Sequence, residues 1–288
     1  MVVEHSEPGS CWQLGSREFR WGSRTHVMAI LNVTPDSFSD GGHWSLPEAA
    51  IRRARACLEE GADLIDVGGE STRPGAVAVS LEEELARILP VVRALVTEPG
   101  MVVSVDTSKF EVAEAALAAG AHLINDVTGL REPRMREVVA RHGAAAIAMH
   151  MQGSPGTMQS DPRYSEVVTE VHAFLFDQAR LARESGIERV MLDPGIGFGK
   201  SLEHNLALLR ALGSLRDAGY PVLLGASRKR FIGDLLDLPV SERLEGSLAA
   251  VAHGVQQGVD VVRVHDVRET VRLVRVLDAL VRGGAAEA

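Results

Sequence analysis

Short apolar segments alternate with longer amphipathic segments along the whole chain, and this alternation most constrains the possible fold. The apolar segments predict buried parallel strands at 27–31, 64–67, 102–105, 122–124, 144–149, 190–192, 222–224 and 259–264. Helical spacing of apolar residues predicts helices at 47–59, 81–97, 110–119, 134–142, 164–185, 203–212, 243–257 and 267–281. Eight strand–helix units of roughly 30 residues favour an α/β fold, a (β/α)₈ TIM barrel, over a doubly wound open sheet.

The domain organisation follows from the length of 288 residues and from the absence of any low-complexity linker. We expect one domain over residues 1–288, with the barrel proper at about 26–283. Ahead of the first strand, residues 12–21 alternate apolar and polar side chains across Gly15-Ser16. This segment is predicted to form a β-hairpin that plugs the bottom of the barrel.

Composition limits the partners and the compartment. A net charge of −9 argues against nucleic acid as the main partner, although a local cationic cluster can still bind a small anion. No apolar stretch reaches the ~18 residues that span a bilayer, and no secretory signal is visible. Cys11 and Cys57 stand in unrelated contexts. We therefore expect a cytoplasmic protein with reduced thiols and no membrane partner.

Polar side chains stand where the predicted strands end, which in a barrel enzyme is where the chemistry occurs. The set comprises Asn32, Asp66, Asp106, Asn125, His150, Asp193, Ser227 with Arg228 and Lys229, and Arg263 with His265. A single residue of this kind is ordinarily a helix N-cap. A whole ring of them instead predicts one binding site at the mouth of the barrel.

The chemistry of this ring suits a flat heterocycle. The carboxylates of Asp106 and Asp193 pair well with an amidine edge such as that of a pterin, and the amide of Asn125 extends the same edge. Lys229 offers a donor to a ring carbonyl or nitrogen, and Arg263 is able to stack on the ring face.

A second group, Asn32, Arg263 and His265, suits an anion, with room for Mg²⁺ through the asparagine oxygen and phosphate oxygens. The loops 32–42 and 68–75 carry glycines and are too long for simple connectors, so we expect mobile lids. The loop 193–200 is similar to a glycine-rich phosphate loop, but its spacing differs from the Walker pattern. Only three of the 30 basic residues are lysines: Lys109, Lys200 and Lys229.

Several segments together resemble the signature sequences of the dihydropteroate synthase family. They are residues 32–42, 66–75, 105–107, 124–126, 149–153, 193–200, 225–229 and 263–266, and the resemblance extends over residues 12 to 283. It implies a pterin-binding TIM barrel that joins 6-hydroxymethyl-7,8-dihydropterin diphosphate to p-aminobenzoate, giving 7,8-dihydropteroate and diphosphate. It also implies Mg²⁺, sensitivity of the family to sulfonamides, and a homodimer formed through the last helices.

The resemblance assigns roles residue by residue. Asp106, Asn125, Asp193 and Lys229 would hold the pterin, with Arg263 over its face. Asn32, Arg263 and His265 would hold the diphosphate, and Asn32 would contribute to Mg²⁺. The p-aminobenzoate pocket would comprise Phe38, Asp40, Thr72, Arg73, Pro74, Phe198, Ser227 and Lys229. Many relatives have a serine after the Ser-Arg-Lys segment, whereas this chain has Arg230, which either pairs with the p-aminobenzoate carboxylate or points to solvent.

The expected reaction is SN1-like, with the diphosphate leaving before the amine attacks. Asp40, Arg73, Lys229, Arg263 and His265 are the predicted catalytic residues, and Asp40 would stabilise the cation and take the amine proton. Three alternatives stay open. They are a pterin-binding methyltetrahydrofolate methyltransferase domain, an aldolase-like barrel with Lys229 as a Schiff base, and a catalytically silent pterin-binding paralogue.

Overall fold

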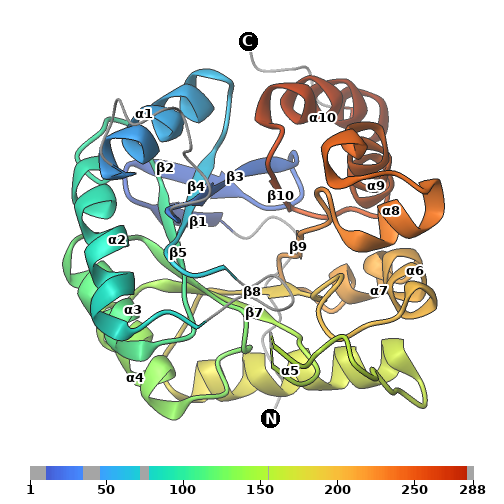
Figure 1. Cartoon of the computed structure of the whole chain (residues 1–288), viewed down its shortest axis with the longest axis horizontal. Coiled ribbons are helices and arrows are strands. Elements are labelled where there is room, and N and C mark those ends of the chain that lie inside the picture. Colours follow the sequence, from blue (N-terminus) through green and yellow to red (C-terminus); the bar gives the residue numbers. More distant parts are fainter. Residues whose placement is uncertain (1–10, 35–45, 72–77, 155, 284–288) are drawn as a thin grey trace.

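A barrel of parallel strands surrounded by helices makes up the computed structural model, which describes residues 11–34, 46–71, 78–154 and 156–283 (Figure 1). The strands are β1 (Cys11–Leu14), β2 (Arg17–Arg20), β3 (His26–Asn32), β4 (Leu64–Gly68), β5 (Val103–Asp106), β6 (Leu123–Asp126), β7 (Ala145–Met149), β8 (Val190–Asp193), β9 (Leu223–Leu224) and β10 (Val261–Val264). The helices are α1 (Leu46–Glu59), α2 (Leu81–Leu95), α3 (Phe110–Ala118), α4 (Pro133–Arg141), α5 (Val167–Glu184), α6 (Leu202–Arg210), α7 (Leu212–Arg216), α8 (Arg230–Leu236), α9 (Leu244–Gln256) and α10 (Val267–Val281).

The eight parallel strands form a closed cylinder. Their order is β8-β7-β6-β5-β4-β3-β10-β9, and an isolated parallel bridge between Leu192 and Val222 joins the two ends of the sheet. The Leu192 N–H donates to the Pro221 carbonyl at 2.9 Å across this seam. The (β/α)₈ prediction is therefore confirmed, and the open-sheet alternative is wrong.

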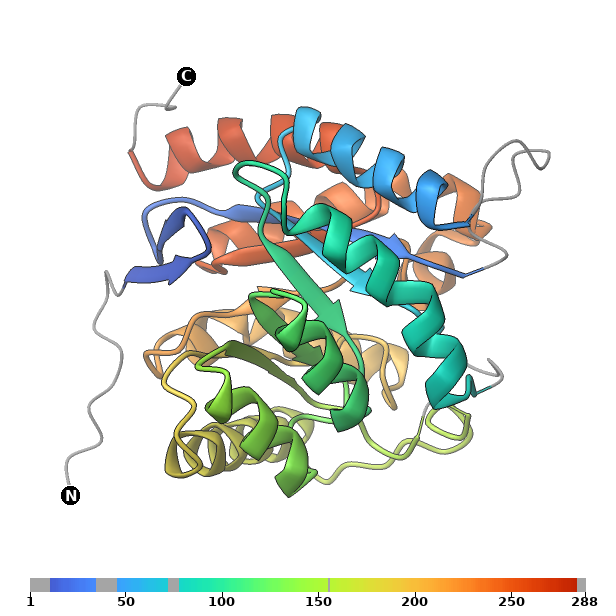
Figure 2. The same ribbon diagram turned by 90° about the vertical axis from the view of Figure 1, so that its left-hand side faces the viewer.

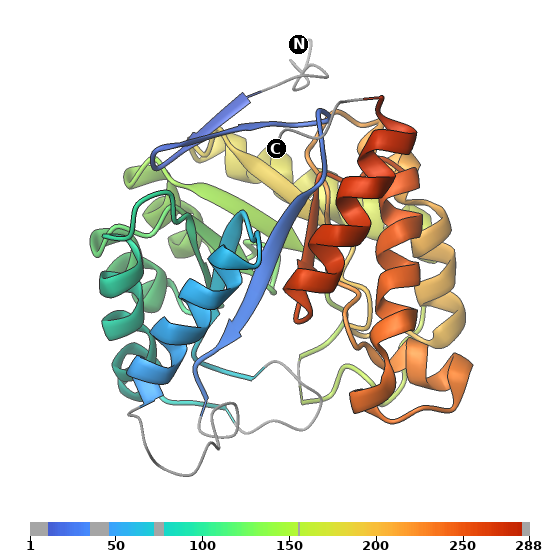
Figure 3. The same ribbon diagram turned by 90° about the horizontal axis from the view of Figure 1, so that it is seen from above.

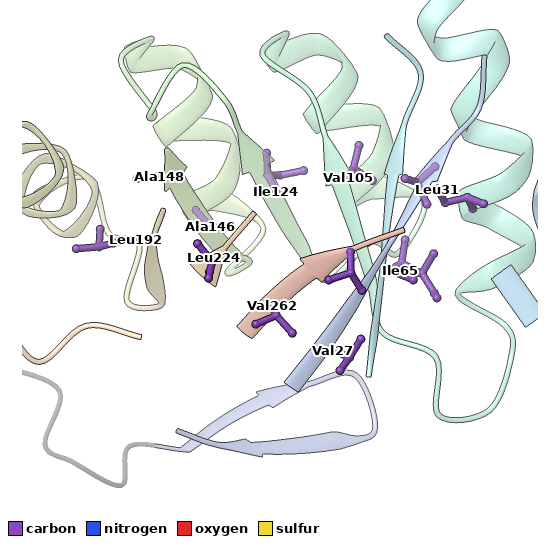
Figure 4. Packing of buried hydrophobic residues seen from close by; sticks show 14 of the residues in the cluster. Val27, Leu31, Ile65, Val105, Ile124, Ala146, Ala148, Leu192, Leu224 and Val262 are labelled. Atoms are coloured by element: carbon purple, nitrogen blue, oxygen red, sulfur yellow. The ribbon is translucent and has the colours of Figure 1, made fainter. Parts of the chain in front are cut away.

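Side chains alternate between two apolar layers because successive residues of a strand face opposite ways. Outward residues such as Val27, Ile65 and Val262 pack against the helices (Figure 4). Inward residues at the strand starts, such as Met28 and Leu64, form a separate cluster inside the barrel. The barrel is thus filled by side chains at its lower end, which leaves the opposite end for a site.

The hairpin β1–β2 closes that lower end. Trp12, Phe19 and Trp21 belong to the same buried cluster as the inward residues at the strand starts. The rings of Trp12 and Trp21 meet edge to face, with centroids 4.9 Å apart. Figures 2 and 3 show the hairpin lying across the end of the barrel at which the parallel strands begin. The predicted plug is confirmed.

Two short helices were not predicted. α7 follows α6 after Ala211, whose backbone (φ −97°, ψ 7°) interrupts the predicted helix 203–212. α8 spans only seven residues directly after Lys229. Segments this short hold two turns at most, too few for a recognisable helical period. In the part of the chain that the structure describes, no helix is long and apolar enough to cross a membrane.

Candidate active site

The register of neighbouring strands aligns the polar side chains at the upper end of the barrel. Asn32 of β3 pairs with Gly68 of β4, Gly68 pairs with Asp106 of β5, and Asp106 pairs with Asn125 of β6. Asp193 ends β8 opposite Met149 of β7. A β-carbon placed on Gly68 would lie 3.8 Å from Asn32 Oδ1 and 3.5 Å from the Asp106 β-carbon. The missing side chain therefore leaves a gap between the two polar groups.

Asp66 connects most of the predicted pterin group, although the sequence placed it only among the strand-end residues. This fully buried side chain lies two residues before Gly68, on the same inward face of β4. Its Oδ2 accepts from Arg263 Nε at 2.6 Å and from Asn125 Nδ2 at 2.9 Å. Arg263 Nη2 also donates to Asp106 Oδ2 at 2.7 Å. Asp66 thus orients the amide of Asn125 and the plane of Arg263.

The carboxyl groups at the mouth are buried, which favours their neutral forms. Burial raises the pKa of Asp106 to about 7, and the charge of Asp66 adds to this while Arg263 opposes it. Burial also raises the pKa of Asp193, although the Gly195 N–H, which donates to Asp193 Oδ1 at 2.7 Å, opposes the shift. Both carboxyl groups would gain from a ligand that donates N–H groups to them.

Lys229 follows a strained turn. Arg228 has a φ of 56°, in the left-handed region that side-chain-bearing residues seldom occupy. Its guanidinium group makes two bonds to Asp266, one of them 3.0 Å from Nε to Oδ2. Its backbone N–H donates to Ser247 Oγ at 2.8 Å. These contacts hold the turn, and such locally strained residues are typical of functional sites.

The ammonium group of Lys229 lies against the loop that follows β8. Its Nζ donates to the Ile196 carbonyl at 2.6 Å and lies 4.0 Å from the centroid of the Phe198 ring. Burial lowers the pKa of Lys229 to about 7, and the nearby charge of Asp193 opposes that shift. The side chain is therefore a cation that responds to pH near neutrality and to any anion placed beside it.

The predicted anion group is only partly assembled. Asn32 and His265 reach a cavity of about 820 Å³ that is lined mainly by α1 and the start of α10, together with Arg228. Ser227 Oγ lies 3.1 Å from His265 Nδ1 and accepts the His265 backbone N–H at 3.2 Å. Arg263 contacts Asp66 and Asp106 in the pterin group. The structure thus brings Asn32, Ser227 and His265 to one side of the mouth, and Arg263 to the carboxylates.

The glycine-rich loop 193–200 uses its N–H groups within the protein. The Gly197 N–H donates to Asn205 Oδ1 at 2.6 Å, and the Phe198 N–H donates to the Gly195 carbonyl at 3.0 Å. The Gly195 N–H is held by Asp193. A phosphate-binding loop would leave such groups for the ligand, so the loop's arrangement does not match one.

The remaining predicted residues fall into two groups. Phe38, Asp40, Thr72, Arg73 and Pro74 lie outside the described residues. Arg230 begins α8 with a side chain that is 75% exposed, and its Nε lies 3.5 Å from Asp234 Oδ1 one turn later. Arg230 therefore points to solvent, which decides between its two predicted orientations.

The fold and the site define a barrel enzyme with carboxylate, amide and cationic groups gathered at the carboxyl ends of its strands. A family model described as "Pterin binding enzyme" matches residues 28–265. The chain is 50% identical to the dihydropteroate synthase of Escherichia coli K12 over 260 residues, which cover 89% of this chain and 92% of that relative. The chain belongs to the pterin-binding enzymes, and within them to the dihydropteroate synthases, which are transferases.

Solved structures agree with this membership. The Yersinia pestis dihydropteroate synthase in a sulfonamide drug complex matches with a TM-score of 0.89 and 44% identity. The match covers 96% of this chain and 100% of that chain. The Xanthomonas albilineans enzyme with 4-aminobenzoic acid matches with a TM-score of 0.88 and 46% identity, covering 94% and 97% of the two chains. At these identities the likeness extends beyond the fold to the family.

Proposed function

We propose that the barrel mouth binds 6-hydroxymethyl-7,8-dihydropterin diphosphate and joins it to p-aminobenzoate, releasing diphosphate and giving 7,8-dihydropteroate. One observation carries the assignment of the site: Asp66 orders Asn125 and Arg263 beside Asp106 inside the barrel mouth. Asp106, Asn125 and Asp193 would hold the amidine edge of the pterin, and Lys229 its ring carbonyl or nitrogen. The 4-aminobenzoic acid bound to the Xanthomonas relative supports the second substrate.

Arg263 has two proposed roles that the contacts help to separate. Held at Nε by Asp66 and at Nη2 by Asp106, its guanidinium group is positioned to cover a pterin face. To stabilise the diphosphate as predicted, the positive charge of Arg263 must attract it from this position beside Asp66 and Asp106. Asn32 and His265 would bind the diphosphate directly, because both stand at the carboxyl ends of the neighbouring strands β3 and β10.

The donor set at Asn32 fits Mg²⁺. Its Oδ1 is a hard oxygen ligand beside the gap at Gly68. Among the described residues no three His, Cys, Asp or Glu side chains form a metal cage. Mg²⁺ usually binds through one or two protein oxygens plus substrate phosphates, so no cage is required. When bound, Mg²⁺ would neutralise charge on the leaving diphosphate.

The proposed mechanism is SN1-like. Asp106, Asn125 and Asp193 hold the pterin deep in the barrel, and His265 and Arg263 stabilise the charge that grows on the departing diphosphate. The electron-rich dihydropterin delocalises the cation at its methylene carbon. The amine of p-aminobenzoate then attacks that carbon and loses a proton.

The p-aminobenzoate pocket is proposed on the side of Lys229. The Phe198 ring and Ser227 would form its wall, and the Lys229 ammonium would pair with the carboxylate. Phe38, Thr72, Arg73 and Pro74 would complete the pocket, and Asp40 would accept the amine proton. Closure of the loops that bear these residues would exclude water, which otherwise captures the cation.

The alternative functions receive less support. The relatives quoted above are dihydropteroate synthases, which disfavours a methyltetrahydrofolate methyltransferase domain and a silent paralogue. Lys229 donates to the Ile196 carbonyl and lies on the Phe198 ring, an arrangement that uses its positive charge. The same relatives also disfavour a Schiff-base role for Lys229, whose lowered pKa would by itself suit a nucleophilic amine as well.

A homodimer and a cytoplasmic location stay predictions. Exposed apolar side chains on α10 support an interface through the last helices: Val276 is 60% exposed and Leu280 is 76% exposed. Light scattering on the purified protein, with Leu280→Arg as the perturbing variant, tests the dimer. A monomer in the wild-type protein would contradict it.

The deciding experiment measures diphosphate release from the pterin substrate with and without p-aminobenzoate and Mg²⁺. We expect 7,8-dihydropteroate to form only when both substrates and Mg²⁺ are present. Release of diphosphate in the absence of p-aminobenzoate, even if slower than in its presence, would support bond breaking ahead of attack. Formation of no coupled product by folded protein would refute the proposed function.

A further inference from the structure

Lys200 is buried beside the site, and no role in the reaction has been given to it. Lys200 is 3% exposed and lies at the end of the loop that follows β8. A buried lysine is costly unless it is fully hydrogen-bonded. Its partners therefore show what it stabilises.

Four acceptor atoms lie within hydrogen-bond distance of Lys200 Nζ, and burial lowers the pKa of Lys200 well below its usual value. Nζ lies 2.8 Å from the Gly195 carbonyl and 2.9 Å from the Phe198 carbonyl, both in its own loop. It also lies 3.2 Å from the His150 carbonyl and 3.0 Å from His150 Nδ1. Burial lowers the pKa of His150 to about 3, and the charge of Lys200 adds to that shift, so the neutral ring accepts through Nδ1. Lys200 ties the loop to the end of β7.

The two loop carbonyls held by Lys200 lie on either side of Ile196. The Ile196 carbonyl accepts from Lys229 Nζ, and the Phe198 ring lies beneath the same ammonium. The loop comes so close to β7 that a β-carbon on Gly195 would lie 1.9 Å from the His150 carbonyl. Lys200 occupies this narrow space as a compact, tetrahedral donor, which a planar guanidinium would not replace.

We propose that Lys200 is a positioning residue for the transfer to p-aminobenzoate. It holds the loop 193–200 so that the Ile196 carbonyl and the Phe198 ring fix Lys229 at the p-aminobenzoate side of the mouth. The inference rests on the proposed function, because it assigns Lys229 and Phe198 to the second substrate. Lys200 itself contacts neither substrate.

The test compares Lys200→Met with Arg282→Met. Arg282 also ties backbone carbonyls, those of Gly22 and Val259 at 2.9 and 2.8 Å, but at the opposite end of the barrel. For each purified variant we would measure the KM for p-aminobenzoate, the Kd of 6-hydroxymethyl-7,8-dihydropterin by calorimetry, and the Tm. Lys200→Met should raise the KM at least about tenfold, since small misplacements at a site have large effects.

The pterin Kd should rise by about threefold or less, well below the rise in KM, because Asp106 and Asn125 are held by Asp66 and only the pterin contacts of Asp193 and Lys229 depend on this loop. Arg282→Met should lower the Tm and leave both constants unchanged. A Lys200→Met protein with a lower Tm and an unchanged KM would overturn the proposal. Equal rises in KM and Kd would also overturn it, since they would place the effect at the pterin contacts of Asp193 and Lys229.

A second variant covers the possibility that Lys200→Met does not fold. Lys200→Arg keeps the N–H donors but not their convergence on one nitrogen, and it should raise the same KM. Wild-type protein is assayed first. If it forms no coupled product, the proposed function fails, whereas an active wild type with unaffected Lys200 variants refutes only the role of Lys200.

Discussion

Replacing Asp66 tests whether one buried carboxylate organises the pterin group. Asp66→Ala removes the acceptor for Arg263 Nε and Asn125 Nδ2, and also for the Ser104 hydroxyl, which donates to the other carboxylate oxygen. Breaking a buried ion pair from one side costs about 3–5 kcal/mol, and each neutral donor left unsatisfied costs about 1–3 kcal/mol. Arg263 keeps its bond to Asp106, which offsets part of the loss. We expect the free energy of unfolding to fall by about 3–5 kcal/mol.

The effect on binding should exceed that of a general loss of stability. Asn125 and Arg263 lose their orientation, so the affinity for 6-hydroxymethyl-7,8-dihydropterin should fall about 100-fold, equivalent to about 2.7 kcal/mol. Asp66→Asn is the matched control. Its carbonyl still accepts from Asn125 and Arg263, and its amide donates to Ser104 if that hydroxyl rotates, so its affinity should fall less.

Calorimetry with the pterin and urea unfolding monitored by tryptophan fluorescence measure the two effects separately. A folded Asp66→Ala protein that binds the pterin within about threefold of wild type would refute this account of the site, since each tenfold corresponds to about 1.4 kcal/mol. An Asp66→Asn protein as weak as Asp66→Ala would show that charge, and not orientation, is what Asp66 supplies.

Three further outcomes are expected. Asp193→Ala should abolish pterin binding in calorimetry because the buried amidine edge loses its partner; near-normal affinity would remove Asp193 from the site. Because the pKa of Lys229 is lowered to about 7, its ammonium form declines as pH rises through 7. The kcat/KM for p-aminobenzoate should therefore fall above that pH, by up to about tenfold per unit, and a Lys229→Met variant with the same pH profile would contradict this. Phe19→Ala in the barrel plug should lower the free energy of unfolding by about 3–5 kcal/mol in urea titrations, against less than about 0.5 kcal/mol for the exposed Glu18→Ala; equal effects would argue against a packed plug.

Much of the fold was predictable because local patterns and tertiary packing agree. Each buried parallel strand must be apolar on both faces, and each outer helix must carry one apolar stripe. The strand at 64–67 and the helix at 267–281 were located in this way to within a residue of β4 and α10. Helices α7 and α8 were missed because their short segments carry no such period.

The sequence predicted which residues belong to the candidate site, but not which of them contact one another. Strand ends identified Asp106, Asn125 and Arg263, since the carboxyl ends of barrel strands share one rim. The sequence contains no signal that Asp66, among these strand-end residues, would accept bonds from both Asn125 and Arg263. Residues 66 and 263 are 197 positions apart, and the pairing of β3 with both β4 and β10 brings their side chains to 2.6 Å.

The periodic pattern of strands and helices, the family and the residue types at the mouth follow from the sequence, because they depend on local order and on motifs. Which of these groups pair depends on the tertiary structure. The order of the strands β10, β3, β4 and β5 sets Arg263 on Asp66 and Asp106. A left-handed turn at Arg228 precedes Lys229, and Lys200 binds the loop that Lys229 contacts. Hydrogen bonds and pKa shifts depend on distances of a few ångströms between segments far apart in sequence, and folding sets those distances.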